Sequence, residues 1–242
     1  MIDKRAIKKY KIRRDGRLKK RGVRLDVDWE EEKHPRAKDG KFTSGSGGEE
    51  KVERKTVKTS EPVKVKLNNT KSSGEYVDLL GKAKKSLSEA DGAWRVTQYK
   101  DGGEFDDWHP GAKMYHTDGG STVAVAKDGD IVGVCHHAGD SVRGKDLIKF
   151  AVENGGIKLD AYDGLFGFYT KCGFEPVSWC KWDEQFAPPD WRKGKDNPEN
   201  IVFYKYTGGK TRYKDVDDFF AKVEASEDYD SAKNIRDKDV GK

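Results

Sequence analysis

The chain has 242 residues, which allows one domain of ordinary size with tails. Hydrophobic residues make up 34% of it and charged residues 38%, which excludes a core that runs its whole length. No apolar run approaches the roughly 18 residues of a membrane span, so no membrane contact is expected. The N-terminus lacks the apolar stretch of a secretory signal, and three cysteines favour a reducing cytoplasm over a disulfide scaffold.

The formal net charge is +5, but it is distributed unevenly. Residues 1–24 hold 12 Lys and Arg against the two acids Asp3 and Asp15. Such a basic arm can bind nucleic acid or an acidic protein through its charge, without sequence specificity. A solvated tail without a partner fits the same composition, so both interpretations stay open.

Residues 1–74 are predicted to be disordered, because Gly, Ser, Lys and Glu dominate and large apolar residues are rare and aperiodic. Within this linker lies HPRAKDGKFTSGSGG, from His34 to Gly48. It resembles a short segment, HPRDxxGKFTSG, that recurs in bacteriophage and prophage head proteins. The resemblance implies a phage or prophage origin, with the host cytoplasm or the virion as location, and carries no chemistry.

From residue 75 the apolar residues become periodic, so a domain is expected over 75–207. Helical spacing predicts helices over 76–87, 143–154 and 164–171. Alternation and turn residues predict a loop over 100–112, a hairpin turn over 127–130, and strands over 93–99, 121–126, 131–136, 157–161, 174–182 and 201–206. Residues 208–242 are expected to hold a short amphipathic helix over 216–223 and a charged tail whose last dozen residues fray.

The segment Asp160 to Phe174 reads DAYDGLFGFYTKCGF and contains the pair Phe168 and Tyr169. It resembles the closing half of the GNAT (GCN5-related N-acetyltransferase) fold, in which a segment like FYxKxGF precedes the last hairpin. The order β-β-α-β-α-β-β from residue 121 is the family's order for its second half, preceded here by a reduced first half. The resemblance implies an α/β fold: a GNAT-like mixed β-sheet flanked by helices.

The resemblance also implies acetyl-CoA as cofactor, held at the start of the helix over 143–154. In the family a Q/R-x-x-G-x-G/A loop binds the pyrophosphate through backbone N–H groups and the positive end of the helix. Gly144 aligns with the last glycine of that loop, whereas Val142 and Gly139 stand at the other two defined positions. Arg143 and Lys145 add positive charge there.

Two more features belong to the same expected cofactor site. A backbone N–H of the strand Ile131–Cys135, near Val134, would polarise the thioester carbonyl. Asp140, in the loop that follows, would repel phosphate.

The resemblance makes Tyr169 the general acid that protonates the leaving thiolate. A structural alternative is a core aromatic whose hydroxyl bonds to the backbone. His136 and His137 are candidate general bases because imidazole titrates near neutral pH, with Asp140 as a third. Alternation along the strand also permits the two histidines to have no chemical role.

No metal is expected, because Cys135, Cys172 and Cys180 form no C-x-x-C pattern and the histidines no H-x-x-x-H pattern. The long loop 183–200 would border the acceptor cleft, where Trp191, with its basic neighbours, either grips an acceptor or covers an apolar edge.

The leading interpretation is transfer of an acetyl group from acetyl-CoA to an amine, in a small molecule or a protein. The alternative is a catalytically inactive GNAT-fold binding module of a phage or prophage, in the virion or against a host factor, tethered through the basic arm.

Overall fold

The computed structural model describes residues 10–12, 18–20, 65–88 and 92–241. The chain divides into two compact units, Met1–Thr59 and Ser60–Lys242. In the first unit, strand β1 (Tyr10–Ile12) pairs antiparallel with β2 (Leu18–Lys20). The rest of the predicted disordered region before residue 65, and the predicted partner of the basic arm over 1–24, fall outside the described residues.

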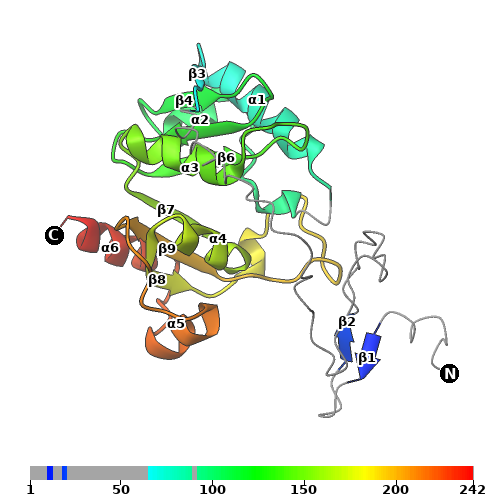
Figure 1. The fold of residues 1–242 in the computed structure, drawn as a ribbon, viewed down its shortest axis with the longest axis vertical. Helices are drawn as coiled ribbons and strands as arrows, with labels where there is room; N and C mark the ends of the chain where they lie inside the picture. The colour runs from blue at the N-terminus through cyan, green and yellow to red at the C-terminus, as the bar shows by residue number, and fades with distance from the viewer. Residues whose placement is uncertain (1–9, 13–17, 21–64, 89–91, 242) are drawn as a thin grey trace, which may run out of the picture. The chain divides into compact units, whose positions relative to one another are not determined.

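The second unit contains the helices and strands that the site is built from (Figure 1). Its strands are β3 (Asn68–Asn69), β4 (Lys113–His116), β5 (Thr122–Val125), β6 (Ile131–Cys135), β7 (Lys158–Tyr162), β8 (Phe174–Cys180) and β9 (Ile201–Tyr206). Its α-helices are α1 (Ser73–Ser86), α2 (Gly102–Trp108), α3 (Gly144–Glu153), α4 (Phe166–Lys171), α5 (Val216–Lys222) and α6 (Tyr229–Val240), with 3-10 helices at Ala93–Arg95, Asp163–Leu165 and Glu184–Phe186.

The strands form two antiparallel sheets rather than the single mixed sheet that was expected. One sheet has the order β3-β4-β5-β6 and the other the order β7-β9-β8 (Figure 1). They meet through one parallel bridge, Asp130↔Lys158, at the start of β6 and β7. The N–H of Ile157 also donates to the carbonyl of Gly129 at 2.8 Å, so in the described residues the backbone hydrogen bonds between the two sheets lie at this end.

The predicted order from residue 121 is confirmed, with β5, β6, α3, β7, α4, β8 and β9 in sequence. The region before it differs. The strand expected over 93–99 is wrong, because Ala93–Arg95 is a 3-10 helix, and the loop expected over 100–112 contains α2. Leu67 is buried and β3 pairs with β4, so the packed unit begins before the expected boundary at residue 75.

The start of α2 explains why its pattern is hard to read. Asp101 caps the helix by accepting from the N–H of Glu104 at 3.0 Å. Gly102 then touches the backbone of Gly74 at the start of α1, where a Cβ would overlap with it. Two glycines at a helix start are local breakers, but the close approach of two helices requires the first of them.

Helices cover both faces of the two sheets. Leu147 and Ile148 of α3 and Phe166 of α4 pack in one cluster with side chains from both sheets. Tyr76 and Leu80 of α1 pack on the opposite face of the first sheet, together with α2. Helix α6 packs through Ala232 against Phe203 and Cys180 of the second sheet, on the face away from α3 and α4.

The expectation that the last dozen residues fray is wrong. Residues 231–240 belong to α6, which Asp228 caps by accepting from the N–H of Ser231 at 2.7 Å. Arg236 of this helix is fully buried and donates to Asp130 at 2.9 and 3.3 Å. It lies 3.8 Å from Asp160 and 5.5 Å from the ring centroid of Phe203. The segment 231–240 is hydrophilic, yet it contributes the buried Arg236 side chain, whose ion pair holds α6 in place.

Strand β6 contains an irregularity at Gly133, which has φ +59°. The register with β5 shifts here, since Thr122 pairs with Cys135 whereas Ala124 pairs with Val132. The carbonyl of Gly133 accepts hydrogen bonds from the hydroxyls of Tyr76, at 3.0 Å, and Thr122, at 3.1 Å. The bulge twists the strand at the point where it leaves β7.

Replacing Gly133 by Ala should destabilise the protein by at least about 1–2 kcal/mol, because L-residues resist this φ and the new Cβ would overlap with the Tyr76 hydroxyl. Gly81→Ala in α1 is the matched control, since its Cβ meets nothing within 4 Å. That variant should gain about 0.5–1 kcal/mol. Urea unfolding measures both, and equal stabilities of the two variants would contradict the bulge geometry.

Arg236→Met should cost about 3–5 kcal/mol of unfolding free energy, because Asp130 would stay buried without its partner. Adding Asp130→Asn should recover part of this loss. As a control, Lys149→Met breaks an exposed pair with Glu153 at 3.9 Å and should change stability by less than about 0.5 kcal/mol. If Arg236→Met lost no more unfolding free energy than Lys149→Met, the stabilising role of the Arg236–Asp130 ion pair would be refuted.

Candidate functional site

The separation of β6 from β7 creates the main candidate site. After the bridge at Asp130 and Lys158, β6 pairs only with β5, and β7 only with β9, among the described residues. Each strand therefore presents one edge of backbone groups to the gap. The part of β6 along this edge includes Val134, the expected backbone contact to the thioester.

Tyr169 of α4 packs against Phe174 of β8, with ring centroids 6.3 Å apart, and is only 7% exposed. Its hydroxyl forms no hydrogen bond with any described residue, unlike the usual buried tyrosine. Burial raises its pKa far above the ordinary value, and the charge of Asp160 raises it further. The phenol therefore stays protonated at neutral pH and holds a proton without an internal acceptor.

A second phenol next to Tyr169 is also without a partner. The rings of Tyr169 and Tyr204 are 5.7 Å apart, and the hydroxyl of Tyr204 is buried with no bond to the described residues. A buried donor without an acceptor costs about 1–3 kcal/mol. The buried Tyr204 hydroxyl, next to the unbonded phenol of Tyr169, marks a place where an outside polar atom would be stabilised.

The loop that follows β6 is organised by Asp140. Its carboxylate accepts from the N–H of Val142 at 2.9 Å, the N–H of Ser121 at 3.3 Å and the hydroxyl of Thr117. Partial burial raises the pKa of Asp140, but the hydrogen bonds from Ser121, Thr117 and Val142 outweigh it and lower the pKa to about 2. Asp140 is therefore an internal anion that shapes the loop, and a poor general base.

The two histidine candidates also contact this loop. The Nε2 atom of His136 lies 3.3 Å from the carbonyl oxygen of Asp140. The Nδ1 atom of His137 accepts from the N–H of Gly139 at 3.2 Å. The backbone N–H of His137 donates to the hydroxyl of Ser121 at 2.9 Å. No contact joins either imidazole to Tyr169 in the described residues, so their catalytic role stays a prediction.

The N-terminus of α3 is open in a way that most other helix starts are not. Side chains of Ser72, Asp101, Asp215 and Asp228 cap α1, α2, α5 and α6, whereas Arg143 at the N-cap of α3 forms no such bond. The N–H groups of Gly144 and Lys145 donate to no described residue. Phe168 of α4 lies beside this end, 3.4 Å from where a Cβ on Gly144 would stand. The structure thus brings Gly144 and the Tyr169 helix together.

These residues fit acetyl-CoA in part. Free N–H groups on Gly144 and Lys145, the cations around them and the unbonded Tyr169 hydroxyl suit a pyrophosphate and a thioester. The Asp140 carboxylate takes the Val142 N–H that a phosphate would use. The set of donors for the anion is therefore limited to the first turn of α3.

Sequence reasoning missed Asp160 as a site residue. It is on β7, on the side that faces α6, and its side chain is 31% exposed. Burial raises the pKa of Asp160 to about 6, and the charge of Asp130 raises it further, against the lowering influence of Arg236. The residue stood within the recognised segment DAYDGLF, but its neighbours Arg236 and Tyr229 come from α6, which the sequence patterns did not place.

Trp191 packs rather than reaching into solvent. Its ring centroid lies 5.0 Å from that of Trp182, which contacts Trp94 at 6.1 Å and Tyr162 at 6.1 Å. The cluster supports the alternative in which Trp191 covers an apolar edge near the end of β7.

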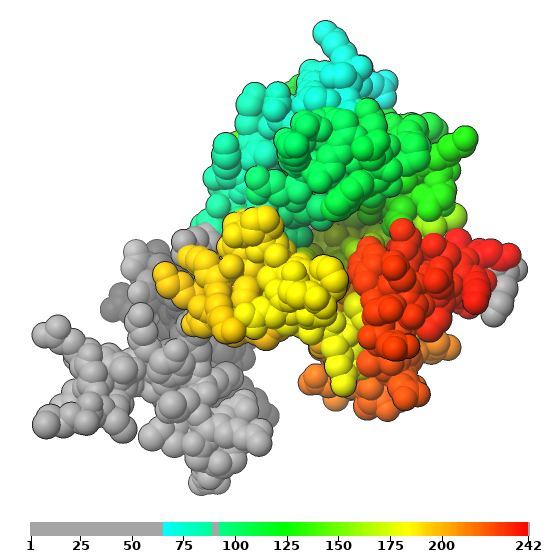
Figure 2. Space-filling view, turned by 180° about the vertical axis from the view of Figure 1, so that it is seen from behind, coloured from blue at the N-terminus to red at the C-terminus, as the bar shows by residue number. Residues whose placement is uncertain are grey.

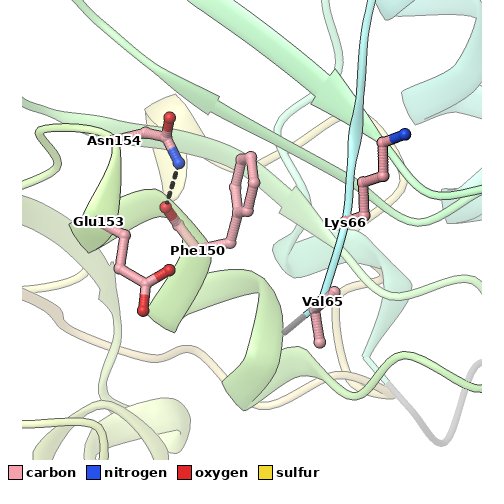
Figure 3. Close-up of a pocket in the computed structure, with 5 residues that line it drawn as sticks. All are labelled: Val65, Lys66, Phe150, Glu153 and Asn154. Carbon is pink, nitrogen blue, oxygen red and sulfur yellow. Dashed lines mark hydrogen bonds between the residues drawn. The ribbon is translucent and has the colours of Figure 1, made fainter. Parts of the chain in front are cut away.

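An open pocket of about 530 Å³ lies elsewhere, between the segment before β3 and the C-terminal end of α3 (Figure 3). Val65, Lys66, Phe150, Glu153 and Asn154 line it, so it contains none of the predicted site residues. In the described part of the chain, no group of three or more His, Cys, Asp or Glu side chains suits a metal ion. None of the described helices is long and apolar enough to span a bilayer.

Comparison of the chain with protein-family models, with curated proteins and with solved structures gives no match.

Tyr169→Phe should change the unfolding free energy by less than about 0.5 kcal/mol, because the lost hydroxyl has no partner. Tyr76→Phe is the matched control, since it removes a buried hydrogen bond of 3.0 Å to Gly133 and should cost about 1 kcal/mol. Thermal unfolding distinguishes them. A loss above about 1 kcal/mol at Tyr169 would mean that its hydroxyl serves the fold.

Proposed function

We propose that this chain is a divergent GNAT-type N-acyltransferase that moves an acetyl group from acetyl-CoA to an amine. The observations that carry the proposal are the single bridge between β6 and β7 in the described residues, beyond which strand edges are unpaired, and the unbonded hydroxyl of Tyr169 on the adjoining helix α4. A thioester in this gap would have a backbone edge on one side and a proton donor on the other.

The chain's own residues divide the work in this proposal. The N–H groups of Gly144 and Lys145, with Arg143, would bind the pyrophosphate at the positive end of α3. Acetyl-CoA would supply the activated acyl group. The β6 edge near Val134 would orient its carbonyl, and Tyr169 would hold the proton that the leaving sulfur needs. The burial of Tyr169 keeps that proton in place until it is required.

A second candidate has its own support. Asp140 already fills part of the loop with negative charge, and its carboxylate accepts from the N–H of Val142. Both features favour a GNAT-shaped binding module without catalysis, for which a phage or prophage role and a basic arm that contacts nucleic acid or an acidic protein remain proposals. The two candidates differ in one property, which is affinity for acetyl-CoA.

Acetyl-CoA at 100 times its Kd should stabilise the folded protein by about 2.7 kcal/mol and raise Tm accordingly. Gly144→Asp should remove this shift, because a carboxylate would stand at the phosphate position. Tyr169→Phe should keep the shift and lose turnover, as expected for a group needed in the transition state.

The matched control is Gly209→Asp, which adds the same carboxylate at an exposed turn far along the chain from α3 and should keep the shift. Differential scanning fluorimetry and calorimetry measure binding, and release of free thiol measures turnover. Absence of any stabilisation by millimolar acetyl-CoA or CoA would overturn the enzyme and favour the binding module.

A further inference from the structure

Tyr204 is a buried tyrosine whose hydroxyl bonds to none of the described residues. It lies in β9, and 0% of its surface is exposed. The hydroxyl oxygen is enclosed and has no hydrogen-bond partner in the described part of the chain. A phenylalanine at this position would avoid the free energy that an enclosed, unbonded hydroxyl costs. Such a group indicates a role for the hydroxyl outside the fold itself.

The aromatic neighbours of Tyr204 come from α4. Its ring centroid lies 5.7 Å from that of Tyr169 and 6.3 Å from that of Phe166. Of these two neighbouring rings, only that of Tyr169 carries a polar atom. The hydroxyl of Tyr169 likewise bonds to no described residue. The two tyrosines therefore form a pair of adjacent hydrogen-bond donors, each without an acceptor in the described part of the chain.

Both tyrosines lie on the face of the second sheet that α3 and α4 cover. Tyr204 belongs to the cluster that contains Tyr169 and the buried side of α3, whereas the adjacent Phe203 packs against Ala232 of α6. Figure 2 shows the red α6 on that other face of the sheet. The tyrosine pair thus shares its side of the sheet with Gly144, the proposed pyrophosphate contact at the start of α3.

The surroundings of the pair oppose the loss of a proton from Tyr169. Burial raises the pKa of Tyr169 far above its ordinary value, and the acidic groups of Asp160 and Cys172 raise it further. Burial also raises the pKa of Tyr204 well above its ordinary value, and Tyr169 and Asp163 add to that rise. All of these titratable neighbours are acidic, so none of their charges would stabilise a phenolate on Tyr169. A phenolate there needs a hydrogen-bond donor.

We propose that Tyr204 is a positioning residue for the acyl transfer, whose hydroxyl donates a hydrogen bond to the Tyr169 oxygen, directly or through one water molecule, as that oxygen loses its proton. The inference rests on the proposed acyltransferase function, in which Tyr169 protonates the leaving sulfur. It adds a residue of the last strand, β9, which lies outside the recognised segment 160–174. A donor that the fold leaves unbonded can form this bond without breaking another one.

The proton and electron movements balance without a further reactant. The nitrogen lone pair of the amine forms the C–N bond, and the C–S bond breaks with its electron pair on sulfur. The O–H bond of Tyr169 breaks, and its proton forms the new S–H bond. The phenolate accepts the hydrogen bond from Tyr204 until it regains a proton from solvent water, to which the new amide nitrogen has released one. Tyr204 keeps its own proton throughout.

The test removes the Tyr204 hydroxyl and observes the phenol at position 169 directly. A polyfluorinated tyrosine at this position of the full chain ionises at lower pH than tyrosine, and its fluorine resonance reports phenolate formation. Tyr204→Phe should lower the ionisation constant of this phenol at least about 10-fold, because a hydrogen bond to a charged oxygen is lost. Tyr115→Phe is the matched control, since Tyr115 is a core tyrosine whose ring packs on Phe150 at 4.9 Å, and it should leave the constant unchanged.

Stability and turnover of the same variants separate a catalytic contribution from a structural one. The urea midpoint of Tyr204→Phe should equal or exceed that of the unmutated protein, because the variant removes an enclosed hydroxyl without a partner. With acetyl-CoA and spermidine as the probe acceptor, Tyr204→Phe should lower kcat at least about 10-fold and leave KM for acetyl-CoA within about twofold. Tyr115→Phe should change neither kinetic constant.

Calorimetry with acetyl-CoA distinguishes failure of this inference from failure of the proposed function. No binding of acetyl-CoA to the unmutated protein overturns the proposed function, and the fluorine titration still decides whether the two phenols bond. Binding of acetyl-CoA together with an unchanged ionisation constant in Tyr204→Phe overturns the role of Tyr204. A urea midpoint of Tyr204→Phe below that of Tyr115→Phe also overturns it, because the hydroxyl would then serve the fold through an internal water molecule.

Discussion

The structure depends on the buried arginine of its last helix. Arg236 is fully enclosed and joins Asp130, just before β6, to Asp160 on β7. These two carboxylates belong to different sheets, which pair with each other through one bridge in the described part of the chain. Because a buried guanidinium without acceptors is costly, α6 can pack only where both sheets meet correctly. The ion pair therefore ties α6 to the place where the two sheets meet.

The separation of the sheets leaves unpaired strand edges between them, and these edges form the candidate site that the rest of the molecule surrounds. Beyond the Arg236 ion pair, the bulge at Gly133, with its positive φ, turns β6 away from β7. The described backbone edges of β6 and β7 there have no strand partners. Tyr169 of α4 packs against Tyr204 of β9, and Asp160 of β7 lies toward Arg236 of α6. Donors and acceptors that fold formation leaves unused are the ones available to a ligand.

The loop between β6 and α3 balances two uses of the same backbone. Asp140 accepts two loop N–H groups and a threonine hydroxyl, which makes the loop rigid without any bound anion. The same bonds reduce the number of donors left for a phosphate, so the open first turn at Gly144 must supply them. Whether the chain binds acetyl-CoA thus depends on the competition between an internal carboxylate and an external pyrophosphate at one helix end.

The sequence by itself determined the elements from β5 to β9, because their apolar residues follow strand and helix periods and their turns contain glycine. It also placed Tyr169 and Gly144 on neighbouring elements. Only the tertiary structure decided α2 and α6, since Gly102 serves a helix contact and Arg236 occupies a core position that hydrophobic patterns assign to apolar residues. The same holds for Asp160: its elevated pKa arises from burial and from the charge of Asp130, against the lowering influence of Arg236 and Tyr229, and local sequence cannot bring these groups together. Periodicity reports which face is buried, whereas the partners of a buried charge are fixed by long-range packing.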